Sequence, residues 1–179
     1  KPLLICVVGA TAIGKTTLSI ALAKALDTEI ISADSRQFYT SMNIGTAVPS
    51  TQELAAAPHH FIQHKSIFDT YSVGDFEREA LLKLDTLFSE KSTAILVGGS
   101  GLYVDAVVNG LDHFPNIDKQ IRETLNTQLD NNGLQLLQQE LMRVDPLYYK
   151  TMDTENPRRV IRALEIYRAT GKPYSSFLK

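Results

Sequence analysis

The sequence predicts an α/β protein with a doubly wound parallel sheet, followed by a smaller helical subdomain. Short apolar runs alternate with segments of helical periodicity in the first part of the chain, whereas the later part shows helical periodicity alone. The 179 residues are 44% hydrophobic and 21% charged, which suffices for a sizeable core. We therefore expect an α/β core over residues 1–115 and a helical subdomain over residues 116–179.

Three apolar runs predict the strands of the core. Residues 3–8 form a continuous apolar run, which is typical of a strand buried on both faces. Residues 29–32 and 93–97 are the other two runs, and both are followed by polar or glycine-rich turns. The helices expected in this part lie at residues 16–26, 76–88 and 102–108.

The segment between the second strand and its following helix lacks a clear period. Residues 45–70 contain Pro49 and Pro58, so we expect irregular surface structure there. Ser72 precedes the amphipathic residues 76–88 and is a candidate N-cap.

The later part of the chain predicts three helices. Two of them carry leucines at helical spacing and meet at a turn at residues 131–133. The third begins at Asn156-Pro157, a cap followed by a proline suited to the first turn, and it ends before Gly171.

Composition excludes several classes of protein. No apolar run approaches the roughly 20 residues of a membrane span, and nothing resembles a secretion signal. Cys6 is the single cysteine, which excludes an internal disulfide and favours the cytoplasm. Residues 1–115 hold 8 Lys/Arg against 12 Asp/Glu, and residues 116–179 hold 10 against 8, an excess too small to indicate nucleic-acid binding alone. No obligate protein partner is indicated.

The letters GATAIGKT at residues 9–16 match the phosphate-loop pattern G-x-x-x-x-G-K-T between a buried strand and a helix. Backbone N–H groups of such a loop surround phosphate oxygens, the lysine adds a charge, and the Thr16 hydroxyl can hold Mg²⁺. The sequence therefore predicts a P-loop NTPase-like core. The residues expected to hold phosphate are Gly9, Ala10, Thr11, Ala12, Ile13, Gly14, Lys15 and Thr16.

An acid at the end of a core strand usually orients the metal in nucleotide-hydrolysing P-loop proteins. The third strand instead runs into Gly98-Gly99-Ser100, and the strand-end carboxylate is Asp34. Because carboxyl ends of parallel strands share one edge, we expect Asp34, Ser100 and Lys15 to converge on one site. Asp34 could there be a metal ligand, a general base or a helix cap.

Two further groups of residues allow two interpretations each. The arginines near residue 160 would form a cationic stripe on a helix, suited either to phosphates or to a solvated face. His59, His60 and His64 could suggest a metal, but adjacent loop histidines are more typical of a polar surface.

Several separated motifs together resemble one family, the tRNA dimethylallyltransferases, also called tRNA isopentenyltransferases or IPP transferases. The resemblance covers nearly the whole chain. It rests on GATAIGKTTL at residues 9–18, SADSRQFYTSMNIGTA at 32–47, APHHFI at 57–62, YSVGDF at 71–76, LVGGSGLYVDAVVNGL at 96–111 and NPRRVIRALEIYRATGKP at 156–173.

This resemblance implies transfer of a dimethylallyl group from dimethylallyl diphosphate to N6 of adenosine 37, next to the anticodon of tRNAs that read codons beginning with U. The phosphate loop and Mg²⁺ would hold the diphosphate leaving group. Asp34 would accept the proton of the adenine amine, with Lys15 and Ser100 assisting as further catalytic residues.

The tRNA anticodon stem-loop is the partner that the resemblance implies, and the target base would be flipped out of its stack. The residues expected to contact tRNA are Asp34, Ser35, Arg36, Gln37, Ser100, Arg122, Arg158, Arg159, Val160, Ile161 and Arg162.

The chain departs from the family pattern in places. Val48 stands where lysine is common, Ser100 replaces a threonine, and the family's long C-terminal portion is not present. Rival hypotheses are an adenylate isopentenyltransferase that makes cytokinin, a small-molecule P-loop kinase, and a non-catalytic nucleotide-binding module.

Overall fold

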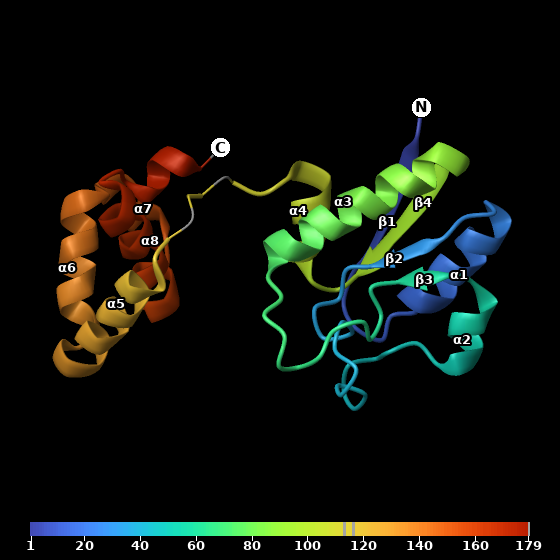
Figure 1. Cartoon of the computed structure of the whole chain (residues 1–179), viewed down its shortest axis with the longest axis horizontal. Coiled ribbons are helices and arrows are strands. Elements are labelled where there is room, and N and C mark those ends of the chain that lie inside the picture. The colour runs from blue at the N-terminus through green and yellow to red at the C-terminus, as the bar shows by residue number, and fades with distance from the viewer. Residues whose placement is uncertain (113, 116, 179) are drawn as a thin grey trace. The chain divides into compact units, whose positions relative to one another are not determined.

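The computed structural model describes residues 1–112, 114–115 and 117–178. The chain divides into two compact units, Lys1–Leu111 and Asp112–Lys179. Figure 1 shows the first in blue to yellow and the second in yellow to red. The predicted boundary lies a few residues further along, after Pro115.

The first unit contains a parallel sheet with the strand order β1-β4-β2-β3. This arrangement confirms the predicted α/β class. The strands are β1 (Leu3–Val8), β2 (Ile30–Ser32), β3 (His59–His60) and β4 (Thr93–Gly98). The helices are α1 (Lys15–Ala25), α2 (Thr51–Ala56), α3 (Val73–Glu90) and α4 (Gly101–Asn109).

Alternate side chains of β4 enter two separate cores, because successive residues of a strand point to opposite faces. Ile95 packs in a cluster with Ala23 of α1, whereas Leu96 packs in a cluster with Phe76 of α3 and Val107 of α4. Helices therefore cover both faces of the sheet, as a doubly wound fold requires (Figure 1).

Strand β1 corrects one expectation. Within residues 1–112, 114–115 and 117–178 it lies at an edge of the sheet, where it pairs with β4. Leu3 and Val8 are each 56% exposed, and Val7 is the buried member of the strand. The apolar run located the strand, but the expected burial on both faces is wrong: in the described part of the chain no further strand pairs along its outer edge, and most of its side chains stay at least partly exposed.

The irregular segment expected at residues 45–70 also needs correction, since it contains α2 and β3. Helix α2 begins with a capping box in which Ser50 Oγ accepts from the Glu53 amide at 3.3 Å, and Glu53 accepts from the Ser50 amide at 2.7 Å. His59 of β3 is in register with Ile30. Both elements are too short to produce a visible period.

Helix α3 begins as the sequence predicts. Ser72 Oγ accepts a hydrogen bond from the Asp75 amide at 3.2 Å, and Asp75 accepts one from the Ser72 amide at 2.8 Å. These bonds satisfy two backbone donors that a helix start otherwise leaves unpaired.

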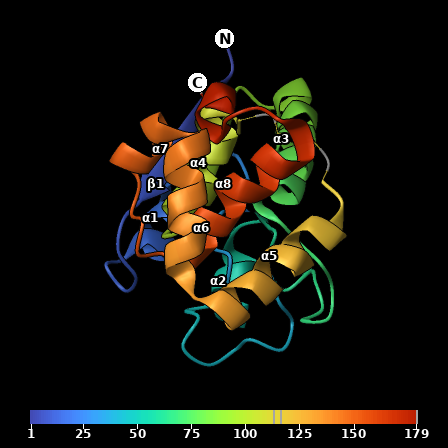
Figure 2. The same cartoon turned by 90° about the vertical axis from the view of Figure 1, so that its left-hand side faces the viewer.

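The second unit is helical (Figure 2), and its leucines form the expected core. Leu125, Leu141 and Leu164 are fully buried. Its elements are α5 (Lys119–Asn132), α6 (Leu134–Val144), α7 (Pro146–Thr151), α8 (Pro157–Thr170) and a 3₁₀ turn (Tyr174–Phe177). The predicted turn between α5 and α6 is confirmed at Gly133.

Asn156 caps α8 as predicted, with Oδ1 accepting from the amides of Arg158 at 3.1 Å and Arg159 at 3.4 Å. Helix α7 was not predicted. Asp145 is 1% exposed and accepts from the Tyr148 amide at 3.1 Å, so it starts a new helix where the sequence indicated only an end. Among the helices described, none combines the length and apolar character needed to cross a membrane.

Candidate functional site

The loop at residues 9–14 connects β1 to α1. Gly14 precedes the helix with a φ of 91°, a left-handed conformation that glycine adopts without a steric penalty. Lys15 opens the helix, and its Nζ donates to the Ala10 carbonyl at 2.5 Å. The free amides of the helix start and this ammonium group make the loop a site for anions.

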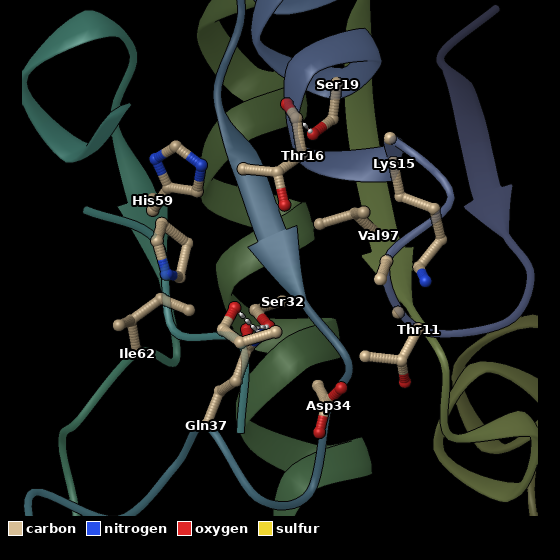
Figure 3. A pocket seen from close by; sticks show the side chains of 15 residues that line it. Thr11, Lys15, Thr16, Ser19, Ser32, Asp34, Gln37, His59, Ile62 and Val97 are labelled. Carbon is tan, nitrogen blue, oxygen red and sulfur yellow. Dashed lines mark hydrogen bonds between the residues drawn. The ribbon is translucent and has the colours of Figure 1, made fainter. Parts of the chain in front are cut away.

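A pocket lies against this loop, and Figure 3 shows the side chains that surround it. Lys15 and Thr16 come from α1, Asp34 from the end of β2, and Gln37 from the segment that follows. The lining residues are Thr11, Ala12, Gly14, Lys15, Thr16, Ser19, Ser32, Asp34, Gln37, Ala47, Pro49, His59, Ile62, Val97 and Gly98.

Two glycines at the end of β4, Gly98 and Gly99, allow neighbouring residues to approach the backbone closely. A Cβ added to Gly98 would lie 2.6 Å from the carbonyl oxygen of Ala33, so any larger residue would push β2 and β4 apart. A Cβ added to Gly99 would lie 3.9 Å from Asp34 Oδ2 and 3.9 Å from Lys15 Nζ. The structure thus brings Asp34 and Lys15 to the same point.

Ser100 lies behind this point and is not among the pocket's lining residues. Its Oγ accepts a hydrogen bond from the Ser35 amide at 3.3 Å and lies 3.3 Å from Ser35 Oγ. Ser100 therefore ties the start of α4 to the segment that carries Asp34.

Asp34 makes a local turn. Its Oδ1 accepts from the Arg36 amide at 3.1 Å, which is an Asx-turn contact. The helix-cap alternative is not what the structure has, because the next described element after β2 is α2, which begins at Thr51. For Oδ2, the described part of the chain supplies no hydrogen-bond donor. One carboxylate oxygen thus holds the backbone while the other faces the site.

Gln37 is held by three hydrogen bonds. Its Nε2 donates to the carbonyls of Ala47 at 2.8 Å and Thr46 at 3.2 Å, and its Oε1 accepts from Ser32 at 3.0 Å. The neighbouring Arg36 is exposed. In this structure Gln37 fixes the loop that forms one wall of the pocket.

Aromatic side chains pack around Phe38, the residue that follows Gln37. Phe38 is fully buried and stacks on Phe76 with ring centroids 5.1 Å apart. Tyr71 meets Phe38 edge-on at 5.4 Å and donates to Glu79 at 2.8 Å. Burial, together with this acidic partner, raises the pKa of Tyr71, so its hydroxyl remains a donor.

His59 lines the pocket, whereas the sequence favoured polar surface or local hydrogen bonding over a metal site for the loop histidines. Its Nδ1 lies 2.8 Å from the Ala57 carbonyl, which can only accept, so Nδ1 carries the proton. The Nε2 atom is buried without a partner among the described residues. Burial lowers the pKa of His59. The sequence could not predict that His59 lines the pocket, because its position depends on strand β3.

Four of the five arginines predicted to contact tRNA lie in the helical unit, and Arg36 lies in the first unit. Arg158 and Arg159 are exposed near the start of α8. Arg122 of α5 and Arg162 of α8 both pair with Glu165, at 2.9 and 3.4 Å. Val160 and Ile161 are 0% and 6% exposed and belong to the hydrophobic core, so the expectation that their side chains contact tRNA is corrected.

A strand, a glycine loop ending in Lys-Thr, and a helix, set on a parallel sheet, define a P-loop phosphate-binding protein. A sequence model of one such family, described as IPP transferase, matches residues 37–179. The chain belongs to the IPP transferase family.

Relatives of known name are similar along nearly the whole chain. A tRNA dimethylallyltransferase of Christiangramia forsetii is 61% identical over 98% of this chain. One of Flavobacterium psychrophilum is 58% identical over 98%. The chain spans 58% and 59% of the lengths of these two relatives.

Solved structures show the same fold. A full-length tRNA isopentenylpyrophosphate transferase from Bacillus halodurans matches 97% of this chain and 58% of its own, with a TM-score of 0.62 and 40% identity. A eukaryotic dimethylallyltransferase, studied while acting on tRNA, matches 98% of this chain and 44% of its own, with a TM-score of 0.78 and 28% identity.

Proposed function

We propose that this chain carries the diphosphate-binding and RNA-binding parts of a tRNA dimethylallyltransferase. The reaction joins the dimethylallyl group of its diphosphate to N6 of adenosine 37 in tRNAs that read codons beginning with U, and it releases diphosphate. One observation carries the proposal: in a member of the IPP transferase family, Asp34 Oδ2 and Lys15 Nζ would each lie 3.9 Å from a Cβ added to Gly99, and both residues line the pocket beside the phosphate loop.

The phosphate loop binds a leaving group in this proposal. The allylic C–O bond breaks while negative charge builds on the diphosphate, and the amides of residues 11–16 with the Lys15 ammonium stabilise that charge. Strand β4 ends at Gly98 and is followed by Gly99 rather than by the acid that phosphoryl transfer usually employs, which is compatible with a reaction in which no phosphoryl group is transferred.

Magnesium is the metal we propose for the site. The Thr16 hydroxyl lines the pocket, and an oxygen donor of this kind fits Mg²⁺. When bound, the ion would add positive charge beside the diphosphate oxygens. Thr16 is the residue that would hold it.

Asp34 acts as the base toward the adenine amine. The lone pair of that amine is delocalised into the ring, so a carboxylate that takes its proton as the new bond forms lowers the barrier. Oδ1 is held by the Arg36 amide, which leaves Oδ2 to accept the proton. Ser100 keeps the Asp34 segment in place through Ser35.

The arginines of the helical unit hold the RNA. Arg158, Arg159 and Arg162 of α8 and Arg122 of α5 are at least partly exposed and suit the phosphates of the anticodon stem-loop. Segment 34–37 would meet the flipped base. We also propose a cytoplasmic location, where tRNA is modified.

Mass spectrometry of nucleosides tests the proposal. Unmodified tRNA is incubated with the protein, Mg²⁺ and dimethylallyl diphosphate, and AMP replaces tRNA in a parallel reaction. Prenylated adenosine in tRNA alone supports the proposal. Prenylated AMP would support an adenylate isopentenyltransferase. In a third reaction, with ATP in place of dimethylallyl diphosphate, a phosphorylated product would support a kinase.

A further inference from the structure

A buried carboxylate lies beneath the arginines of the helical unit. Glu165 is on α8, and its side chain is 8% exposed. Its Oε2 accepts from Arg122 Nη2 at 2.9 Å and from Arg162 Nη1 at 3.4 Å. Helices α5 and α8, which supply these groups, pack against each other (Figure 2).

One glutamate thus serves two arginines, and the cluster keeps a net positive charge. The side chains of Arg122 and Arg162 are 51% and 40% exposed, so their outer faces remain open to solvent. Each guanidinium has five N–H donors, and the contact with Glu165 occupies one donor of each. The remaining donors can bind phosphate oxygens.

Arg162 is restrained a second time. Its guanidinium lies over the ring of Phe114, 5.1 Å from the ring centroid, and Phe114 itself stacks on Tyr174 at 5.0 Å. A planar guanidinium held by a carboxylate and a ring loses little further freedom when it binds.

The other arginine pair on α8 is built differently. Arg168 donates to both carboxylate oxygens of Glu140, at 3.0 and 2.6 Å, and also to Gln128 at 2.9 Å. Its side chain is 25% exposed. This pair of one arginine with one glutamate joins α6 to α8 and has no net charge. The cluster of two arginines with Glu165 has a net charge of one positive unit.

We propose that Glu165 is a positioning residue that fixes Arg122 and Arg162 in the orientation in which they bind RNA phosphates. The inference rests on the proposed function, because it assumes that these arginines contact the anticodon stem. The positioning role and the charge of Glu165 predict opposite effects on RNA affinity when the carboxylate is removed. Removing an acid near an RNA surface should strengthen binding, whereas loss of positioning should weaken it.

The test measures binding of an anticodon stem-loop RNA by fluorescence anisotropy at fixed salt. Glu165→Gln should weaken binding about five- to tenfold despite the added positive charge, because two arginines must then be ordered on binding. Glu140→Gln is the matched control: it breaks the other pair with the same charge change and should leave binding equal or slightly stronger.

A mutant cycle tests whether Glu165 acts through the two arginines or only through the stability of the fold. In a background of Arg122→Ala with Arg162→Ala, Glu165→Gln should change RNA affinity less than twofold, because its effect passes through these arginines. If Glu165→Gln does not fold, as judged by circular dichroism, Glu165→Asp keeps the charge, withdraws the oxygen from Arg122 and should weaken binding too.

The outcomes distinguish the two proposals. If the unchanged protein does not bind the stem-loop, the proposed RNA substrate fails, and this inference fails with it. If the protein binds and Glu165→Gln or Glu165→Asp binds as tightly or more tightly, only the positioning role is overturned. A loss of equal size in the double-arginine background overturns it as well.

Discussion

The two units hold their functional charges in different ways. In the first, Lys15 and Asp34 lie at the ends of adjacent elements, and backbone features position them: a left-handed glycine, a helix start and two close-packed strands. In the second, arginines on two helices are positioned by the side chain of Glu165. The first site therefore depends on how the backbone is arranged, while the second depends on an ion pair between side chains 43 residues apart.

This difference has a consequence for substitutions. A change of side chain in the first site should remove chemistry but leave the scaffold intact, unless the change touches a glycine. In the second unit, a change in one buried carboxylate alters two arginines at once. Four substitutions and one pH titration sharpen this comparison.

The largest effect is expected from Asp34→Asn. The amide has nearly the same shape but cannot take a proton from the adenine amine, so the rate of prenyl transfer should fall about 10²- to 10⁴-fold. Diphosphate binding should be retained, because the phosphate loop is unchanged. Single-turnover assays and calorimetric titration with diphosphate measure the two quantities. Equal activity of the variant would remove Asp34 from its assigned role.

A large loss of stability is expected from Gly98→Ala. The new Cβ would lie 2.6 Å from the Ala33 carbonyl oxygen, so β2 and β4 must separate. We expect the free energy of unfolding to fall by about 1–3 kcal/mol in urea titrations. Gly101→Ala is the control, because its Cβ would meet nothing within 4 Å on α4, and it should be neutral or stabilising.

Removing a helix cap gives a smaller, matched test in the two units. Ser72→Ala and Asn156→Ala should each lower the free energy of unfolding by about 1 kcal/mol. Asn156 also orders the first turn of α8, which bears Arg158 and Arg159. Only Asn156→Ala should therefore weaken binding of the stem-loop RNA. If Ser72→Ala weakened it equally, the arginines would not depend on their own helix start.

Much of the fold was predictable because its signals are local. The phosphate loop, the strand-end Asp34 and the cap at Asn156 each lie within a few residues of the element that they define, and the structure has all of them where the sequence placed them. Helix α7 was missed because Asp145-Pro146 fits both the end of one helix and the start of another.

The less predictable parts depend on strand order and on distant side chains. Exposure of β1 follows from its place at the sheet edge, which an apolar run does not encode. Glu165 and Arg122 are 43 residues apart, so no spacing rule relates them. His59 lines the pocket because it lies on β3, and a strand of two residues is too short to show a periodicity in the sequence.

The smallest expected effect is a pH dependence of stability from His59. Burial lowers the pKa of His59 from 6.5 in the folded chain, so on acidification the unfolded chain takes up this proton first. The free energy of unfolding should therefore decline as the pH falls from 7 to 5.5, a range above the 4.5 at which glutamates ordinarily titrate. His64, whose pKa burial also lowers, contributes in the same direction. In urea titrations at several pH values, His59→Gln should show a shallower decline than the unchanged protein. Identical slopes would mean that His59 is as accessible to protons in the folded chain as in the unfolded one.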